Sequence, residues 1–110
     1  LMNGILKLKS NDFKMVDLSN VSAAVEYTAA GRDIPYRLYC SLYKDDCLVG
    51  FTSIFDTAES MTDGNKVYSV SFPKDGDNTY PEFDRISLFM FDSDETLKPV
   101  CTAYTINKND

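Results

Sequence analysis

The chain has 110 residues, the length of one domain, and 44% of them are hydrophobic, so we expect it to bury a core rather than to be disordered. Its formal net charge of −6 argues against nucleic acid as a partner, because binding phosphates requires a basic surface. The same charge argues against binding to anionic lipid. No apolar run approaches the ~20 residues of a membrane span, so we expect no direct membrane insertion.

Alternating apolar and polar residues predict short strands along most of the chain, because successive side chains of a strand point to opposite faces. In the first half, the predicted strands are 5–9, 13–16, 21–28, 34–43 and 47–55. The sequence Lys44-Asp45-Asp46 favours a hairpin turn between the last two. Gly50 indicates a bulge or a close approach of two strands.

The second half alternates between polar loops and strands. A loop is predicted at 56–66 and a strand at 67–72, which Pro73 ends because proline cannot donate to a strand ladder. A second loop, rich in Asp, Asn, Gly and Pro, is predicted at 73–83. A closing hairpin at 84–106 follows, with an acidic turn at 92–94.

The first strand of this closing hairpin has one continuously apolar face. Even-numbered residues from Ile86 to Met90 are predicted to face the core, and odd-numbered residues from Ser87 to Phe91 the opposite side. The pattern predicts a single all-β domain over residues 1–110, an immunoglobulin-like antiparallel β-sandwich of about seven or eight strands. The predicted core consists of Val25, Tyr36, Leu38, Cys40, Val49, Phe51, Val70, Phe72, Ile86, Leu88, Met90 and Val100.

The cysteines are predicted to be free thiols. If 45–46 is a two-residue turn, Lys44 faces Cys47 and Cys40 faces Phe51, a register that argues against a disulfide between the two cysteines. Together with Cys101 they lack C-x-x-C spacing, and the chain has no histidine, so a zinc site is not expected. One disulfide remains the alternative.

Two segments resemble a known sequence pattern. Residues 39–49, YCSLYKDDCLV, resemble alYd-x-x-g-x-Lv, and residues 86–99, ISLFMFDSDETLKP, resemble vKvFlWDslxslkPl, with Phe91 in place of the tryptophan. Both patterns occur in small β-sandwich modules of secreted, multi-modular Gram-positive bacterial proteins, often beside glycoside hydrolases or surface adhesion domains. The resemblance implies an immunoglobulin-like sandwich, an extracellular or cell-surface location and a non-catalytic role, with no defined ligand.

Catalytic groups are scarce. Without histidine, neither a Ser-His-Asp nor a Cys-His arrangement can form. The carboxylates that could act as a pair are Asp45 with Asp46, and Asp92 with Asp94 and Glu95. Both groups lie in predicted tight turns, where solvated turn residues are the simpler interpretation. We therefore predict that the domain is not an enzyme.

One loop concentrates oxygen ligands. Asp75, Asp77 and Asp84, together with Asn78 and Glu82, are the kinds of residue that calcium binds. Their order does not follow the D-x-D-x-D-G-x₅-E pattern of an EF-hand. Calcium is thus a candidate ligand of Asp75, Asp77 and Asp84, and no other cofactor is expected.

Aromatic residues supply the second candidate site. Tyr39 and Tyr43 lie on the more polar face of their predicted strand, and Phe89 and Phe91 on the less apolar face of theirs. If these faces coincide, the rings form a patch that could bind a glycan, because flat aromatic faces cover the C–H face of a sugar. The alternative is that a neighbouring strand or loop buries them.

Two functions follow from these patterns. The leading hypothesis is a structural or protein-interaction module that contacts neighbouring modules of its own chain or another surface protein. The alternative is a carbohydrate-binding module that uses the aromatic residues. Because Leu1 begins without a basic leader, we expect the sequence to be part of a longer secreted or surface-anchored bacterial protein.

Overall fold

The computed structural model describes residues 3–8, 12–28, 34–58, 64–92 and 101–110, and they are almost entirely strands. The strands are β1 (Asn3–Leu8), β2 (Val21–Thr28), β3 (Ile34–Lys44), β4 (Cys47–Ala58), β5 (Gly64–Val70), β6 (Arg85–Asp92), β7 (Cys101–Thr102) and β8 (Tyr104–Asn107). A short 3-10 helix, η1 (Phe13–Met15), precedes β2. No helix in these described ranges is long and apolar enough to cross a membrane.

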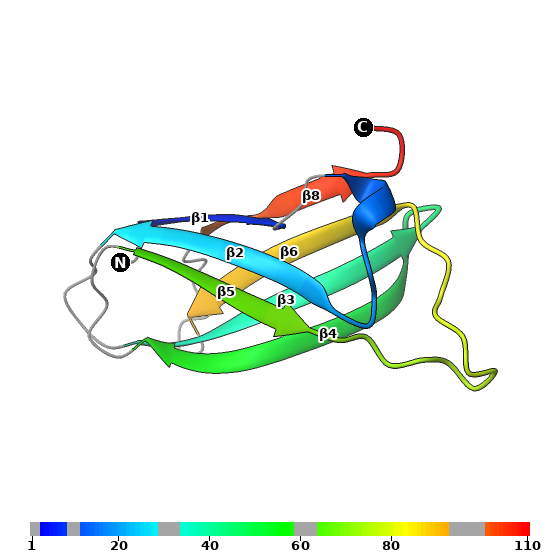
Figure 1. Cartoon of the computed structure of the whole chain (residues 1–110), viewed down its shortest axis with the longest axis horizontal. Coiled ribbons are helices and arrows are strands. Elements are labelled where there is room, and N and C mark those ends of the chain that lie inside the picture. Colours follow the sequence, from blue (N-terminus) through cyan, green and yellow to red (C-terminus); the bar gives the residue numbers. More distant parts are fainter. Residues whose placement is uncertain (1–2, 9–11, 29–33, 59–63, 93–100) are drawn as a thin grey trace.

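The strands form two sheets that pack as layers (Figure 1), in the orders β5-β2-β1-β7 and β4-β3-β6-β8. Neighbouring strands are antiparallel except β1 and β7, which are parallel. Strands one, two and five share one sheet, and strands three, six and the last share the other, as in immunoglobulin domains. The prediction of an all-β, immunoglobulin-like sandwich is therefore confirmed.

The core lies between the two sheets, and the faces predicted for the first strand of the closing hairpin, which is β6, are correct. Leu38, Cys40 and Leu42 of β3 and Ile86, Leu88 and Met90 of β6 are almost fully buried and form one core cluster with Val21, Ala23 and Val25 of β2. The side chains of two predicted core residues, Tyr36 and Val100, lie outside the described part. The predicted core residues that the structure confirms are Val25, Leu38, Cys40, Val70, Phe72, Ile86, Leu88 and Met90.

The β3–β4 hairpin contains one extra residue. Lys44 faces Cys47 as predicted, and both residues of the intervening turn have positive φ, as a two-residue hairpin turn requires. The register then shifts, so that Leu42 faces Gly50 and Val49 has no opposite residue. A Cβ atom at Gly50 would lie 2.9 Å from Leu42 Cδ1, so a larger residue would require Leu42 to shift, and the predicted close approach is confirmed.

This bulge reverses the faces predicted for β4. Cys40 faces Thr52 and not Phe51, because one extra residue moves every following side chain to the other side of the strand. Val49 and Phe51, predicted in the core, are 37% and 49% exposed. Their assignment to the core was wrong, and Phe51 lies on the outer face of its sheet.

Two other local predictions need correction. Residues 13–16 contain η1 instead of a strand, because the Asp12 side chain accepts a hydrogen bond from the backbone N–H of Lys14 at 3.0 Å and caps the turn. The loop predicted at 56–66 is shorter, since β4 continues to Ala58 and β5 begins at Gly64. The loop predicted at 73–83 is confirmed, because it has no strand or helix.

The two cysteines with described side chains are free thiols in different environments. Burial raises the pKa of the Cys40 thiol to about 12, whereas Cys47 is exposed. Since only the thiolate reacts, roughly one Cys40 thiol in 10,000 is reactive at pH 8. We expect iodoacetamide to alkylate Cys47 and spare Cys40 in the native protein, measured by peptide mass spectrometry. In 6 M guanidinium both should react; equal native labelling would contradict the burial of Cys40.

Candidate functional site

The outer face of the β4-β3-β6-β8 sheet carries a cluster of aromatic rings. The core contains Leu38, Cys40 and Leu42 of β3 and Ile86, Leu88 and Met90 of β6, so the odd-numbered residues between them point outward. Tyr39 lies 5.5 Å from Phe51 and 5.7 Å from Phe91 between ring centroids, and Phe91 stacks on Phe89 at 6.3 Å. We call Tyr39, Phe51, Phe89 and Phe91 the aromatic patch.

The aromatic patch surrounds an open depression of about 410 Å³, and Ser41 is the other residue that lines it. Ser41 faces Phe51 on one side and Ser87 on the other. Both serines are only 4% exposed. The depression therefore has aromatic walls around one small hydroxyl-bearing residue, Ser41.

The structure places the four predicted aromatic residues on one face, three of them together and Tyr43 apart from them. Tyr39, Phe89 and Phe91 share the depression, and Phe51 joins them through the bulge. Tyr43 lies on the same face at the other end of β3, where the Arg85 guanidinium stacks 4.3 Å from its ring centre. Sequence reasoning missed Phe51, although Gly50 beside it was the available signal for a bulge.

Charge on this face differs from that of the whole chain. The chain has 17 acidic residues, yet the described outward side chains of this sheet include none. They include Arg37, which donates to Ser53 Oγ at 3.4 Å, and Arg85, whose Nη1 lies 3.4 Å from Asp46 Oδ1 in the adjoining turn. Among the described outward side chains of this sheet, a surface that approaches the aromatic patch meets rings, hydroxyl groups and two arginines.

The predicted calcium residues are not brought together. Asp75 accepts hydrogen bonds within its own loop, from the backbone N–H of Asp77 at 3.0 Å and from the Thr79 hydroxyl at 2.9 Å. Asp84 instead accepts from the backbone N–H of Asp45 at 3.1 Å. Across the described ranges, no three Asp, Glu, Cys or His side chains are placed to hold a metal ion.

Hydrogen bonds from the backbone and hydroxyl of Thr79 hold the pKa of Asp75 below its usual value. This stabilisation is present above the normal aspartate pKa and is lost as the pH falls through the lowered value. We expect Thr79→Val to raise the Asp75 midpoint, because the hydroxyl bond is removed. The carboxyl carbon shift in an NMR titration measures it, and an unchanged midpoint would contradict the assigned cause.

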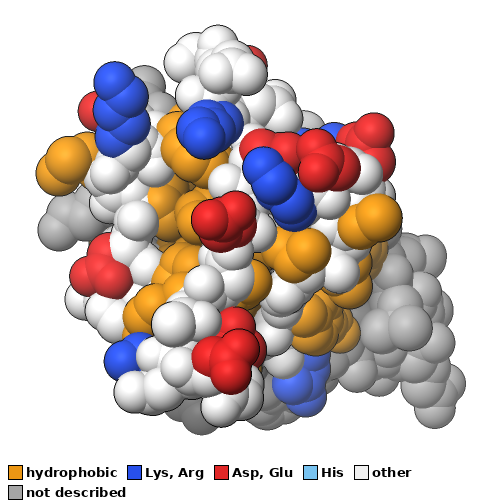
Figure 2. Space-filling view, turned by 90° about the vertical axis from the view of Figure 1, so that its right-hand side faces the viewer, with side chains coloured by type: hydrophobic (Ala, Val, Ile, Leu, Met, Phe, Trp, Pro, Cys, Tyr) orange, Lys and Arg blue, Asp and Glu red, His pale blue; other side chains and the backbone are white. Residues whose placement is uncertain are grey.

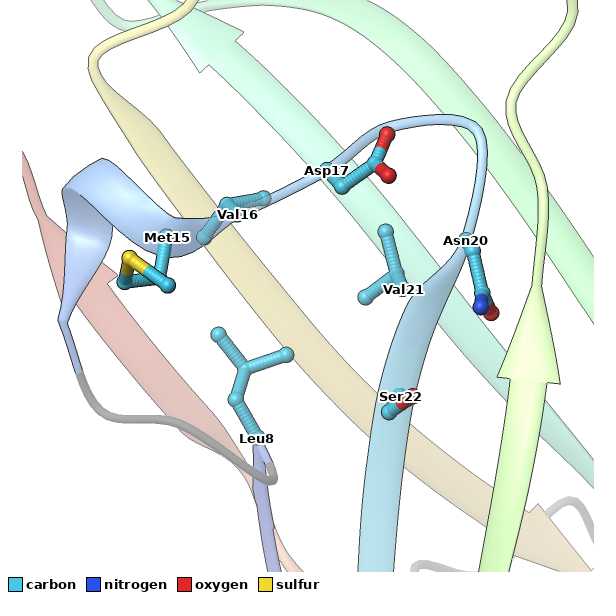
Figure 3. A pocket seen from close by; sticks show the side chains of 7 residues that line it. All are labelled: Leu8, Met15, Val16, Asp17, Asn20, Val21 and Ser22. Carbon is cyan, nitrogen blue, oxygen red and sulfur yellow. The ribbon is translucent and has the colours of Figure 1, made fainter.

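A second depression, of about 360 Å³, lies between η1 and the start of β2 (Figure 3). Leu8, Val16 and Val21 supply much of its lining. The Asp17 carboxylate points away from them (Figure 3) and accepts from the Ser19 hydroxyl at 2.7 Å and its backbone N–H at 3.0 Å. These bonds lower the pKa of Asp17. The carboxylate beside this depression is therefore already engaged in a local turn with Ser19.

One end of the molecule has a surface of mixed character. Figure 2 shows apolar side chains across the middle of one end of the molecule, with acidic and basic side chains around them. This mixed surface contrasts with the outer face of the β4-β3-β6-β8 sheet, where the described outward side chains include no carboxylate.

The comparison with known proteins adds no assignment. No protein-family model matches this chain, and a search of curated proteins returns no significant match. The functional interpretation consequently depends on the chemistry of the aromatic patch and its surroundings.

Proposed function

We propose that this domain is a non-catalytic interaction module of a larger secreted or cell-surface bacterial protein, and that the aromatic patch docks a partner protein. The observation that carries the proposal is a set of rings gathered on an outward sheet face, with Phe51 49% exposed. Aromatic residues are enriched at the centre of protein interfaces, where their burial contributes most of the affinity. The secreted setting follows from the resemblance of 39–49 and 86–99 to bacterial β-sandwich modules.

The residues around the depression favour a protein over a glycan. A sugar needs several polar groups to orient its hydroxyls, whereas the lining consists of four rings and one serine. Two nearby hydroxyls already have protein partners, because Ser53 accepts from Arg37 and Ser87 bonds Thr105. An apolar side chain of a partner therefore matches this lining better than a sugar ring does.

Site-specific photo-crosslinking in the full-length protein, expressed in its own organism, tests the proposal. A photoreactive amino acid at Ser53, beside the aromatic patch, is expected to crosslink one defined protein or neighbouring module. The same amino acid at Ser69, exposed on β5 of the opposite sheet, should not capture it. The identified partner is then purified and its affinity measured directly.

Substitutions within the aromatic patch give the quantitative result. Tyr39→Ala and Phe51→Ala should each weaken binding of the purified partner by about 10-fold or more, as expected for central aromatic residues. Val67→Ala, which truncates an exposed residue on the opposite sheet, is the matched control and should change affinity less than about 2-fold. Binding of an oligosaccharide on a glycan array that Tyr39→Ala and Phe51→Ala abolish would replace the proposal with carbohydrate binding.

A further inference from the structure

Two serines at the base of the aromatic patch differ in hydrogen bonding. Ser41 and Ser87 face each other across β3 and β6, and both are 4% exposed. Ser87 Oγ lies 2.9 Å from Thr105 Oγ1 and is satisfied by it. Ser41 Oγ has no hydrogen-bond partner within the described residues. Buried hydroxyls are normally paired, so this one indicates a missing partner.

The surroundings of Ser41 restrict what that partner can be. The depression that Ser41 lines is bounded by the aromatic patch, and its volume of about 410 Å³ is near the lower end for a binding pocket. It suits a single ring-sized side chain. Such a ring can pack against Tyr39, Phe89 and Phe91 in the tilted and stacked geometries that aromatic groups prefer.

Building on the proposed function, we propose that the depression receives a tryptophan side chain of the partner, with its indole N–H donating to Ser41 Oγ. Tryptophan combines a large aromatic surface with one N–H donor, and it is enriched among residues that dominate binding energy. The chain itself contains no tryptophan. A second copy of this domain therefore cannot supply the side chain, which has to come from a different sequence.

The absence of tryptophan also makes the experiment direct, because the fluorescence of an added indole has no tryptophan background. N-acetyl-tryptophanamide is the probe, and its N1-methyl derivative lacks only the N–H donor. We expect the first to bind with a millimolar Kd and a blue-shifted emission. The methyl derivative should bind with a Kd about 3- to 10-fold higher, because that ratio corresponds to the net contribution of one hydrogen bond.

Matched serine variants locate the donor–acceptor contact. Ser41→Ala should abolish the preference for the unmethylated probe while keeping binding, and Ser87→Ala should retain the preference. Thermal denaturation provides a readout without ligand. Ser87→Ala breaks the bond to Thr105 and should lower the midpoint by about 4 °C, whereas Ser41→Ala should leave the midpoint unchanged or raise it.

The outcomes separate the two proposals. Equal affinity of the two indole probes, or a preference that persists in Ser41→Ala, overturns the tryptophan contact and leaves protein docking standing. N-acetyl-phenylalaninamide binding as tightly as the tryptophan probe would do the same. If no aromatic amide at 20 mM shifts the NMR signals of the aromatic patch but an oligosaccharide does, protein docking fails as well.

Discussion

Leu88→Ala is expected to lower the free energy of unfolding by about 3 kcal/mol, measured by urea denaturation. Leu88 is fully buried on β6, between Cys40 on β3 and Tyr104 on β8. Truncating it removes apolar surface from the middle of the core and leaves a cavity, because close-packed neighbours relax only in part. In a domain of this size, such a loss is a large fraction of the total stability.

Val67→Ala is the control for this prediction. Val67 lies on the outer face of the other sheet and is 55% exposed, so its truncation should cost less than about 1 kcal/mol. Similar losses for the two variants would mean that Leu88 is not at the centre of a packed core. The two-layer arrangement would then need revision.

Insertion of one alanine between Gly50 and Phe51 is expected to lower the free energy of unfolding by about 3 kcal/mol or more and to remove Phe51 from the aromatic patch. Gly50 faces Leu42, so the inserted residue would face Ser41 and Phe51 would move opposite Cys40, inside the core. The inner residues Thr52 and Ile54 would turn outward. Urea denaturation measures the loss of stability, and the tryptophan probe measures the loss of the site.

Val49→Ala distinguishes the residue count from the side chain. Because Val49 is 37% exposed, replacing it while keeping the bulge should cost less than about 1 kcal/mol and leave probe binding intact. An insertion variant as stable as the parent, with Phe51 still on the outer face, would show that the number of residues between the turn and Phe51 does not determine the direction of Phe51.

The sequence predicts the parts of this fold that local alternation determines. Strand β6 has uninterrupted alternation, so both of its faces and most of the core could be predicted. Alternation gives the wrong prediction where a local feature interrupts the strand or adds one residue to it. Asp12 caps η1 in a segment that otherwise fits a strand, and Val49 shifts β4 by one position.

The candidate site was predictable to a similar extent. The alternation places Tyr39, Phe89 and Phe91 on outward positions, but only the pairing of β3 with β6 shows that they meet. Tyr43 shares their face but lies at the other end of β3, where its ring contacts Arg85, a residue of β6 that is distant in the sequence. That the Ser41 hydroxyl has no partner among the described residues depends on three-dimensional neighbours and has no sequence signal.

The passage of the chain from β7 in one sheet to β8 in the other has a mechanical consequence. β7 runs parallel to β1, with Gly4 beside Cys101 and Ile5 beside Thr102. When the two ends of the chain are pulled apart, β1 is drawn toward the N-terminus and β7 toward the C-terminus. Because the two strands are parallel, all hydrogen bonds between them are then loaded in shear at the same time and are not opened one by one. This short ladder would therefore resist stretching of the domain along its strands more than a hairpin peeled from its end.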